Sequence, residues 1–383
     1  MEFGLSEELV AMKELARDFA QKEILPTLEE DEKTHRFRPE RVRKMGDLGF
    51  FGVLIPEEYG GTGAGFLASV LMTEEVAKVS NSWALPFNMQ TMGPGLTVLN
   101  YGTEEQKQKY IPKWVSGEYL GCFAITEPGT GSDVAGMKTT ATEDGDWFVL
   151  NGNKMWISNA HVADAGIVYA YTDRSARTRG MSAFIVDLKN TPGISTVAIE
   201  TKMGLPCSPT GEINFENARI PKSALLGEKG AGFKICMWML DNTRISCAAR
   251  AVGVGGAALE HSIKYANERE QFGQLIGDFQ MIQDQIATMY VEHEAAKLLV
   301  YRAAWLKDQG VRNTLETSVA KYFAAEACVN AANTAVKIFG SYGFSTEYPV
   351  ERLYRDCKSF QIVEGTSNIQ KMIIAGFALG RRK

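Results

Sequence analysis

Residues 282–300 read IQDQIATMYVEHEAAKLLV, a segment in which apolar side chains recur at alternating steps of four and three residues. Residues at this spacing share one face of an α-helix. The predicted face consists of Ile282, Ile286, Met289, His293, Ala296 and Val300. A continuous apolar face of this kind is typical of a helix packed inside a bundle. His293 is interpreted as a packed core or interface histidine rather than a ligand, because buried histidines usually find a hydrogen-bond partner within the fold.

The positions of the prolines indicate where else in the chain long helices occur. Eleven of the twelve prolines lie at or before Pro221, and the next is Pro349. The interval between them is rich in Ala, Lys, Glu and Met, and a long proline-free stretch of this composition predicts long helices. Two amphipathic segments before residue 120, residues 7–25 and 67–79, predict helices there as well.

The middle of the chain has a different pattern. Short runs rich in aromatic and β-branched residues predict strands at 147–158, 166–172, 181–188 and 212–220, and Asn151-Gly152 within the first predicts a hairpin turn. No helix-length segment separates these runs, which favours an antiparallel sheet or barrel. We therefore expect an α+β, mostly α protein: an N-terminal helical domain (1–120), a central antiparallel β-barrel-like domain (121–226) and a C-terminal four-helix bundle (227–383).

Composition argues against several function classes. The formal net charge of -5 gives no general reason to expect nucleic acid or an anionic membrane as a partner. No apolar run is long enough for stable membrane insertion, and the acidic N-terminal segment is unlike a targeting peptide, so a cytoplasmic location is expected. The six cysteines are scattered without metal-ligand spacing, and no metal site is predicted. No G-x-G-x-x-G follows a predicted strand, which disfavours a Rossmann domain.

Residues 362–369, IVEGTSNI, combine a carboxylate, a glycine and a helix-start signal. Thr366 or Ser367 can cap the following helix, which would place Glu364 beside the unpaired N–H donors of a helix N-terminus. A carboxylate in this position can take a proton while the donors stabilise developing negative charge. Gly365 would let a ligand approach the backbone. Taken alone, the motif is equally an ordinary loop-to-helix junction.

Five separated motifs occur together in this chain: ITEPGTGSD (125–133), NGNKMWISNA (151–160), LDNTR (240–244), EREQFG (268–273) and IVEGTSNIQ (362–370). Their order and spacing strongly resemble the FAD-dependent acyl-CoA dehydrogenase family, in a branch similar to the glutaryl-CoA and alicyclic acyl-CoA dehydrogenases of anaerobic bacteria. The resemblance covers essentially the whole chain. It implies an enzyme that dehydrogenates an acyl-CoA thioester at its α and β carbons.

The resemblance implies a flavin site in two parts. In the first, Phe123 and Thr126 hold the isoalloxazine edge, Trp156 lies against the ring, and Ser158 reaches flavin N5. Additional positions in this part are Gly131 and Ser132, near the pyrophosphate, and Thr366 and Asn368. Taken singly, the glycines and Ser132 are equally a surface turn, and Trp156 is equally a core residue.

The second part of the implied flavin site comes from a neighbouring subunit. Its positions are Arg269, Gln271, Phe272, Lys337, Gly340 and Ser341; Gln280 is a further implied cofactor-binding position. Lys337 departs from the Gln of several relatives. The Arg269 guanidinium suits a bidentate contact to a phosphate, although as an isolated residue it is equally a surface arginine. A cofactor shared between subunits implies an obligate oligomer, here a homotetramer.

For catalysis, the resemblance makes Glu364 the base that removes the proton α to the thioester. The thioester oxygen then bonds the Glu364 N–H, and Gly365 follows the base in the motif. Some branches place the base where this chain has Thr243, so Glu364 is the only candidate at either family position. Asp241, Arg244 and Ser132 are implied in substrate binding, although Asp241 and Arg244 are equally a surface ion pair.

The acyl group is inferred from residues that resemble the end of the family's substrate pocket. A dicarboxylic substrate needs a cation at its far end, and Ala84 stands where the glutaryl branch has an arginine. With Phe87 and Gln90, Ala84 predicts a pocket for a neutral acyl group. The first candidate is conversion of cyclohexane-1-carboxyl-CoA to cyclohex-1-ene-1-carboxyl-CoA. Short or branched acyl-CoAs and non-decarboxylating oxidation of glutaryl-CoA are the alternatives.

The resemblance also implies an electron-transferring flavoprotein as the electron acceptor. Two other function classes remain open. The first is a flavin oxidase that reacts with oxygen, and the second is a helical scaffold that has lost its cofactor.

Overall fold

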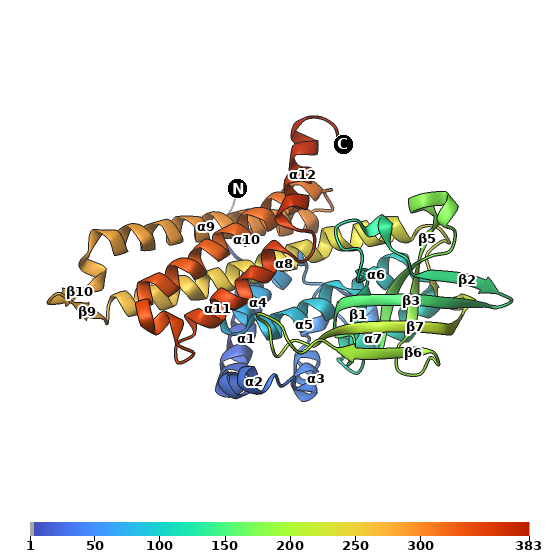
Figure 1. Cartoon of the computed structure of the whole chain (residues 1–383), viewed down its shortest axis with the longest axis horizontal. Coiled ribbons are helices and arrows are strands. Elements are labelled where there is room, and N and C mark those ends of the chain that lie inside the picture. Colours follow the sequence, from blue (N-terminus) through green and yellow to red (C-terminus); the bar gives the residue numbers. More distant parts are fainter. Residues whose placement is uncertain (1–3, 383) are drawn as a thin grey trace.

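The computed structural model describes residues 4–382, and its elements follow the predicted order of helices, strands and helices (Figure 1). The predicted fold class is confirmed. Within residues 4–382, seven α-helices come first: α1 (Glu7–Phe19), α2 (Leu28–Thr34), α3 (Pro39–Asp47), α4 (Phe66–Val79), α5 (Asn81–Met92), α6 (Pro94–Tyr101) and α7 (Glu104–Val115). Side-chain caps mark some of their starts. Ser6 caps α1, and Thr103 forms a capping box with Gln106 at α7.

One sheet occupies the middle of the chain. Its strands are β1 (Gly121–Ala124), β2 (Thr140–Asp144), β3 (Trp147–Ser158), β4 (Ala165–Tyr171), β5 (Met181–Asp187), β6 (Ile194–Ala198), β7 (Thr210–Pro221) and β8 (Leu225–Leu226). The order is β6-β7-β3-β2-β4-β5-β8, with β1 beside β4. Most pairs are antiparallel, but β1 and β2 each pair parallel with β4, so the sheet is mixed. The rings of Phe148 (β3) and Phe184 (β5) lie 5.0 Å apart in the core that this sheet encloses.

The prediction of a hairpin at Asn151-Gly152 is wrong. The chain runs straight through these residues in β3, and the pairing register with β7 shifts between Leu150 and Gly152. A side chain at Gly152 would lie 2.5 Å from the Thr139 hydroxyl, so the glycine serves a close approach within a bulge. The tight turn instead falls at Gly145, between β2 and β3, where φ is +59°.

The C-terminal part is helical. It contains α8 (Gly232–Ala266), α9 (Gln280–Asp308), α10 (Thr314–Phe339), α11 (Val350–Cys357) and α12 (Ser367–Ala378), with the short hairpin β9 (Glu270–Gln271) and β10 (Gln274–Leu275) between α8 and α9. Helices α8, α9 and α10 pack against one another, and α11 and α12 pack on α10. The predicted bundle face is confirmed, because Met289, Ala296 and Val300 are buried. His293 packs against Gly256 of α8, and burial lowers the pKa of its imidazole to about 4.

Helices α4 and α5 pack against α8, so the first helical region and the bundle share one large core. The N-terminal part of α8 packs against one face of the sheet through Ile235, Cys236 and Met239. All six cysteines are buried and unpaired. Across residues 4–382, no helix has the length and hydropathy needed to span a membrane. The same residues bring no three potential metal-binding side chains together.

Candidate active site

The loop that carries Glu364 has an unusual backbone. It joins the 3-10 turn η10 (Lys358–Gln361) to α12, and both Glu364 (φ +59°) and Gly365 (φ +87°) are left-handed. A non-glycine residue in this region is strained and persists only where its surroundings hold it. Thr366 caps α12 by accepting a hydrogen bond from the Ile369 N–H at 3.3 Å. Glu364 therefore lies two residues before a helix N-cap, as the motif predicts.

Two side chains hold this loop from inside. The Lys321 ammonium of α10 is wholly buried and donates to the Phe360 carbonyl at 2.6 Å and the Gly365 carbonyl at 2.8 Å. Gln370 of α12 also donates to the Gly365 carbonyl, at 2.9 Å. Burial lowers the pKa of Lys321, and the two carbonyls supply its hydrogen bonds. Neither residue is among those predicted from the sequence, although the single lysine inside the alanine-rich run SVAKYFAAEA is a usable signal.

Helix α8 contacts the loop with consecutive side chains. The Thr243 hydroxyl donates to Glu364 Oε2 at 2.5 Å, and Arg244 Nε donates to the Glu364 carbonyl at 2.9 Å. Arg244 also pairs with Asp241 at 2.9 Å, and Asp241 accepts a bond from the Thr314 hydroxyl at 2.8 Å. The Asp241–Arg244 pair thus links α8, α10 and the Glu364 loop and is more than a helix-surface pair. The sequence marks Thr243 only as a position that lacks an acid, and its contact with Glu364 is evident only in the fold.

The first group of predicted flavin residues lies where β1 meets β3. The Thr126 carbonyl accepts a bond from the Met155 N–H at 2.9 Å, and Asn159 donates to the Gly121 carbonyl at 3.0 Å. Phe123, in β1, is half-buried. The segment after β1 is therefore held along the end of β3.

A buried ion pair fixes the same segment. Lys154 donates to the Ile125 carbonyl at 3.1 Å and to Glu127 at 2.9 Å. Burial acts to raise the pKa of Glu127, but the Lys154 charge and bonds from Thr139 and Lys138 outweigh it and lower that pKa. The Glu127 carboxylate is thus ionised, and its bonds to Lys154, Thr139 and Lys138 hold the segment after β1 in place.

The surface above this junction is open. Trp156 has a left-handed backbone (φ +60°), and 54% of its side chain is exposed. Ser158 is half-buried, and Gly131 and Ser132 are exposed. No atom lies within 4 Å of a side chain placed at Gly131. An exposed indole beside an unobstructed glycine turn fits a planar ring system with attached phosphates.

The second group of predicted flavin residues lies at one end of the long axis, around β9 and β10 (Figure 1). Phe272 is left-handed (φ +52°) and 95% exposed. Arg269 lies over the ring of Tyr342 at 5.6 Å, which brings Gly340 and Ser341 to the same end. Other predicted positions on this part of the surface are Gln271, Gln280 and Lys337.

The two groups are far apart within one chain. Cys236 of α8 packs in one cluster with Phe123 of the first group, and Ala266 ends α8 just before the second group; the two residues are separated by roughly 45 Å along the helix axis. Thr366, the α12 cap, and Asn368, which is exposed, belong with the Glu364 end. One chain therefore does not bring all predicted flavin residues around a single ligand.

The predicted acyl-pocket residues lie in α5. Ala84 and Phe87 are wholly buried. Gln90 is engaged by the backbone: it donates to the Tyr119 carbonyl at 2.8 Å and accepts from the Gly121 N–H at 2.5 Å. Gln90 thus joins α5 to the start of β1, a role the sequence did not indicate, and a contact with the acyl group stays a prediction.

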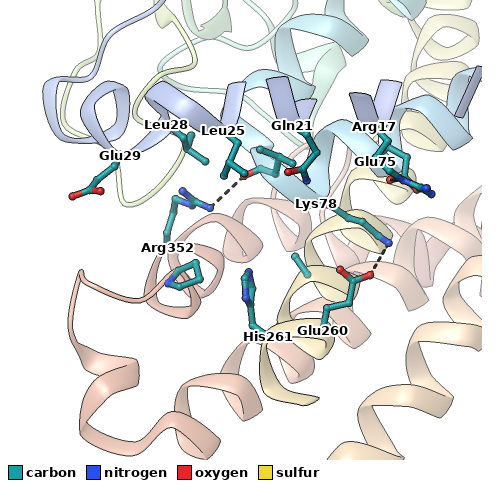
Figure 2. Close-up of a pocket in the computed structure, with 13 residues that line it drawn as sticks. Arg17, Gln21, Leu25, Leu28, Glu29, Glu75, Lys78, Glu260, His261 and Arg352 are labelled. Atoms are coloured by element: carbon teal, nitrogen blue, oxygen red, sulfur yellow. Dashed lines mark hydrogen bonds and ion pairs between the residues drawn. The ribbon is translucent and has the colours of Figure 1, made fainter. Parts of the chain in front are cut away.

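A cavity of about 570 Å³ lies away from Glu364, between the N-terminal helices, α4, α8 and α11 (Figure 2). Its charged walls are largely paired, since Lys78 bonds Glu260 at 2.8 Å and Arg17 bonds Glu75 at 3.0 Å. None of the predicted flavin or substrate residues lines it. It carries no part of the site described above.

Comparison with known proteins shows which family has this sequence pattern. The sequence matches the N-terminal domain of acyl-CoA dehydrogenases over residues 6–118, the middle domain over 122–218 and the C-terminal domain over 230–379. The chain belongs to the acyl-CoA dehydrogenase family. It is thus a member of a family of oxidoreductases, as predicted.

Several relatives of this acyl-CoA dehydrogenase align over its full length. The glutaryl-CoA dehydrogenase of Desulfococcus multivorans is 51% identical, covering 100% of this chain and 99% of the relative. The caffeyl-CoA reductase-Etf complex subunit CarC of Acetobacterium woodii is 45% identical, over 98% of this chain and 99% of the relative. The structure of a glutaryl-CoA dehydrogenase glutaryl-CoA complex matches with a TM-score of 0.97 at 49% identity, covering 100% of this chain and 98% of that one.

Members of this family depend on FAD, which agrees with the predicted cofactor. The exposed Trp156, the open turn at Gly131 and the exposed Phe272 are consistent with such a ligand. The individual assignments of residues to flavin or substrate stay predictions.

Proposed function

We propose that this acyl-CoA dehydrogenase uses Glu364 to remove the α proton of an acyl-CoA thioester, while bound FAD supplies the acceptor for the β hydride. The observation that carries the proposal is the fixed position of Glu364. Its strained backbone is held by Lys321, Gln370 and Arg244, and its carboxylate by Thr243. A base held in one place needs little reorganisation before proton transfer.

The same geometry supports a site for the thioester oxygen. The N–H of Glu364 has no acceptor among residues 4–382, and it lies just before the N-terminus of α12. A free N–H beside a helix N-terminus can stabilise negative charge on the thioester oxygen as the α proton leaves. The base and the oxyanion donor would then belong to one residue.

Anaerobic titration with acyl-CoA thioesters tests the proposal directly. The purified enzyme should be yellow, and its flavin absorbance should bleach with a thioester that it oxidises. Glu364→Gln should keep the flavin and bind the same thioester while flavin reduction slows by several orders of magnitude, since only the proton acceptor is lost. Full activity of this variant, or a flavin unaffected by every thioester, would contradict the proposal. Peroxide formed in air at the rate of turnover would instead indicate an oxidase.

The separation of the two flavin groups supports an oligomer, with a homotetramer as the proposed form. One subunit would contribute the Trp156 side of each site, and another would contribute Arg269 and Phe272. Dilution below the dissociation constant of the oligomer should then release FAD. A monomer that retains FAD would contradict this part of the proposal. We also propose an electron-transferring flavoprotein as acceptor, with support from the relative named as a subunit of an Etf complex.

Two classes of acyl group remain, and they differ in one physical requirement. The wholly buried Ala84 and Phe87 favour a neutral group such as cyclohexane-1-carboxyl or a short or branched chain. The glutaryl-CoA dehydrogenase relative favours a group that ends in a carboxylate. A buried carboxylate needs a cation at the far end of the pocket. The location of buried cations therefore distinguishes the two classes.

A further inference from the structure

Arg250 of α8 is a buried arginine whose charge is not paired. Only 1% of it is exposed, and its Nε and Nη2 have no acceptor among residues 4–382. Its Nη1 donates to Asn81 Oδ1 at 3.5 Å, and its guanidinium carbon lies 5.6 Å from the Phe360 ring centroid. These are weak contacts for a desolvated cation. A buried guanidinium without a carboxylate is costly, so this position calls for an anion.

Arg250 lies close to the predicted acyl pocket. Asn81, its partner, begins α5, and Ala84 lies one turn further on the same face of that helix. On α8, Arg250 follows Thr243 by seven residues, which places both on one face about 10 Å apart along the axis. The guanidinium therefore lies beyond the Glu364 contact and beside Asn81, one helical turn from Ala84.

A second buried cation lies in the same region. Lys321 and Arg250 both act on the pKa of the buried Cys247 thiol, which lies between Thr243 and Arg250 on α8. Lys321 bonds two backbone carbonyls, whereas Arg250 has only the Asn81 amide oxygen. Neither cation has a carboxylate partner among residues 4–382, and of the two Arg250 is the one left with unused donors.

We infer that Arg250 binds a carboxylate at the far end of the acyl group, so that the substrate is the CoA thioester of a short dicarboxylic acid; this rests on the function proposed above. Ala84 cannot pair with this carboxylate, and Arg250 of α8 provides the cation instead. The small side chain of Ala84 leaves space in which the guanidinium can contact the ligand. Phe87 provides an apolar wall for the methylene groups between the carboxylate and the thioester. The prediction of a neutral acyl group rests on residues of α5 alone and does not include Arg250.

The test uses two thioesters of equal chain length, glutaryl-CoA and pentanoyl-CoA, which differ in a terminal carboxylate or methyl group. Binding is measured by calorimetry with the FAD-loaded Glu364→Gln variant, alone and combined with Arg250→Met. Loss of Arg250 should weaken the binding of glutaryl-CoA by about 30-fold or more and the binding of pentanoyl-CoA by less than about threefold. Arg250→Lys, which keeps the charge, should retain part of the preference. Equal effects on both thioesters, or none on either, would overturn the inference.

Unfolding temperatures without ligand provide an independent readout. If Arg250 serves a ligand, Arg250→Met should unfold no lower than the parent, because it removes an unpaired buried charge. A lower unfolding temperature in both Arg250→Met and Arg250→Gln would indicate a structural role and overturn the inference. Bleaching by pentanoyl-CoA without any preference for glutaryl-CoA would overturn the inference and leave the proposed reaction intact. Absence of bleaching with every thioester would overturn the proposed reaction itself.

Discussion

Replacing Thr243 by valine should slow the chemical step without removing the cofactor. Valine has nearly the shape of threonine but no hydroxyl, so the substitution deletes the 2.5 Å bond to Glu364 Oε2 and little else. Thr243 is only 3% exposed, so water has little access to replace that bond. Serine at the same position keeps the hydroxyl and is the matched control.

The size of the effect follows from the charge of the acceptor. A hydrogen bond to an ionised group contributes about 1.5 to 3 kcal/mol, and 1.4 kcal/mol is a factor of ten in rate. If the bond is needed in full to aim the carboxylate, flavin reduction should slow about 10- to 150-fold in Thr243→Val. Among residues 4–382 the Thr243 hydroxyl has one other contact, a 3.5 Å approach to the Leu240 carbonyl, which is at the limit of a hydrogen bond and contributes little.

Anaerobic stopped-flow measurement of flavin reduction at saturating thioester isolates this step. Thr243→Ser should stay within about threefold of the parent, because a hydroxyl still reaches Glu364. FAD content and thioester affinity should be unchanged in both variants. Equal rates for the parent, Thr243→Ser and Thr243→Val would show that this bond does not position the base.

Three other substitutions test other parts of the structure. Lys321→Met should slow flavin reduction about 10- to 100-fold at unchanged FAD content, since two charge-assisted bonds to the Glu364 loop are lost; an unchanged rate would contradict the role of Lys321 in holding the loop. Burial, and then the Glu32 charge, raise the pKa of Asp356 from 3.8 to about 7. The folded chain therefore keeps a proton that the unfolded chain loses, and stability should fall by up to about 4 kcal/mol between pH 4 and 7 relative to Asp356→Asn, by urea unfolding; parallel curves would refute this. Burial lowers the pKa of His293 from 6.5 to about 4, so the unfolded chain binds the proton first and stability should fall by up to about 3 kcal/mol from pH 6.5 to 4; His293→Gln should lack this fall, and its persistence would place the titration elsewhere.

Local pattern predicted the elements well where a single helix or strand provides its own evidence. Apolar residues that recur at steps of four and three after Ile282 form the buried face of α9. The Thr366 hydroxyl caps α12, at the start that the sequence predicts. The same reasoning failed at Asn151-Gly152, where a turn signal lies inside β3. Residue 152 must be glycine because a side chain there would collide with Thr139 on a neighbouring segment. The turn preference of the Asn-Gly dipeptide does not indicate which segments pack against it.

The position of Glu364 just before a helix cap can be predicted from residues adjacent in the chain, because a helix start depends on local hydrogen bonds. Its surroundings depend on packing. Thr243 lies 121 residues away in the chain, Arg244 lies 120 away, and Lys321 reaches Gly365 across 44. The unpaired charge of Arg250 becomes visible only when α5, α8 and η10 are assembled, since burial and the absence of a carboxylate are properties of the packed core.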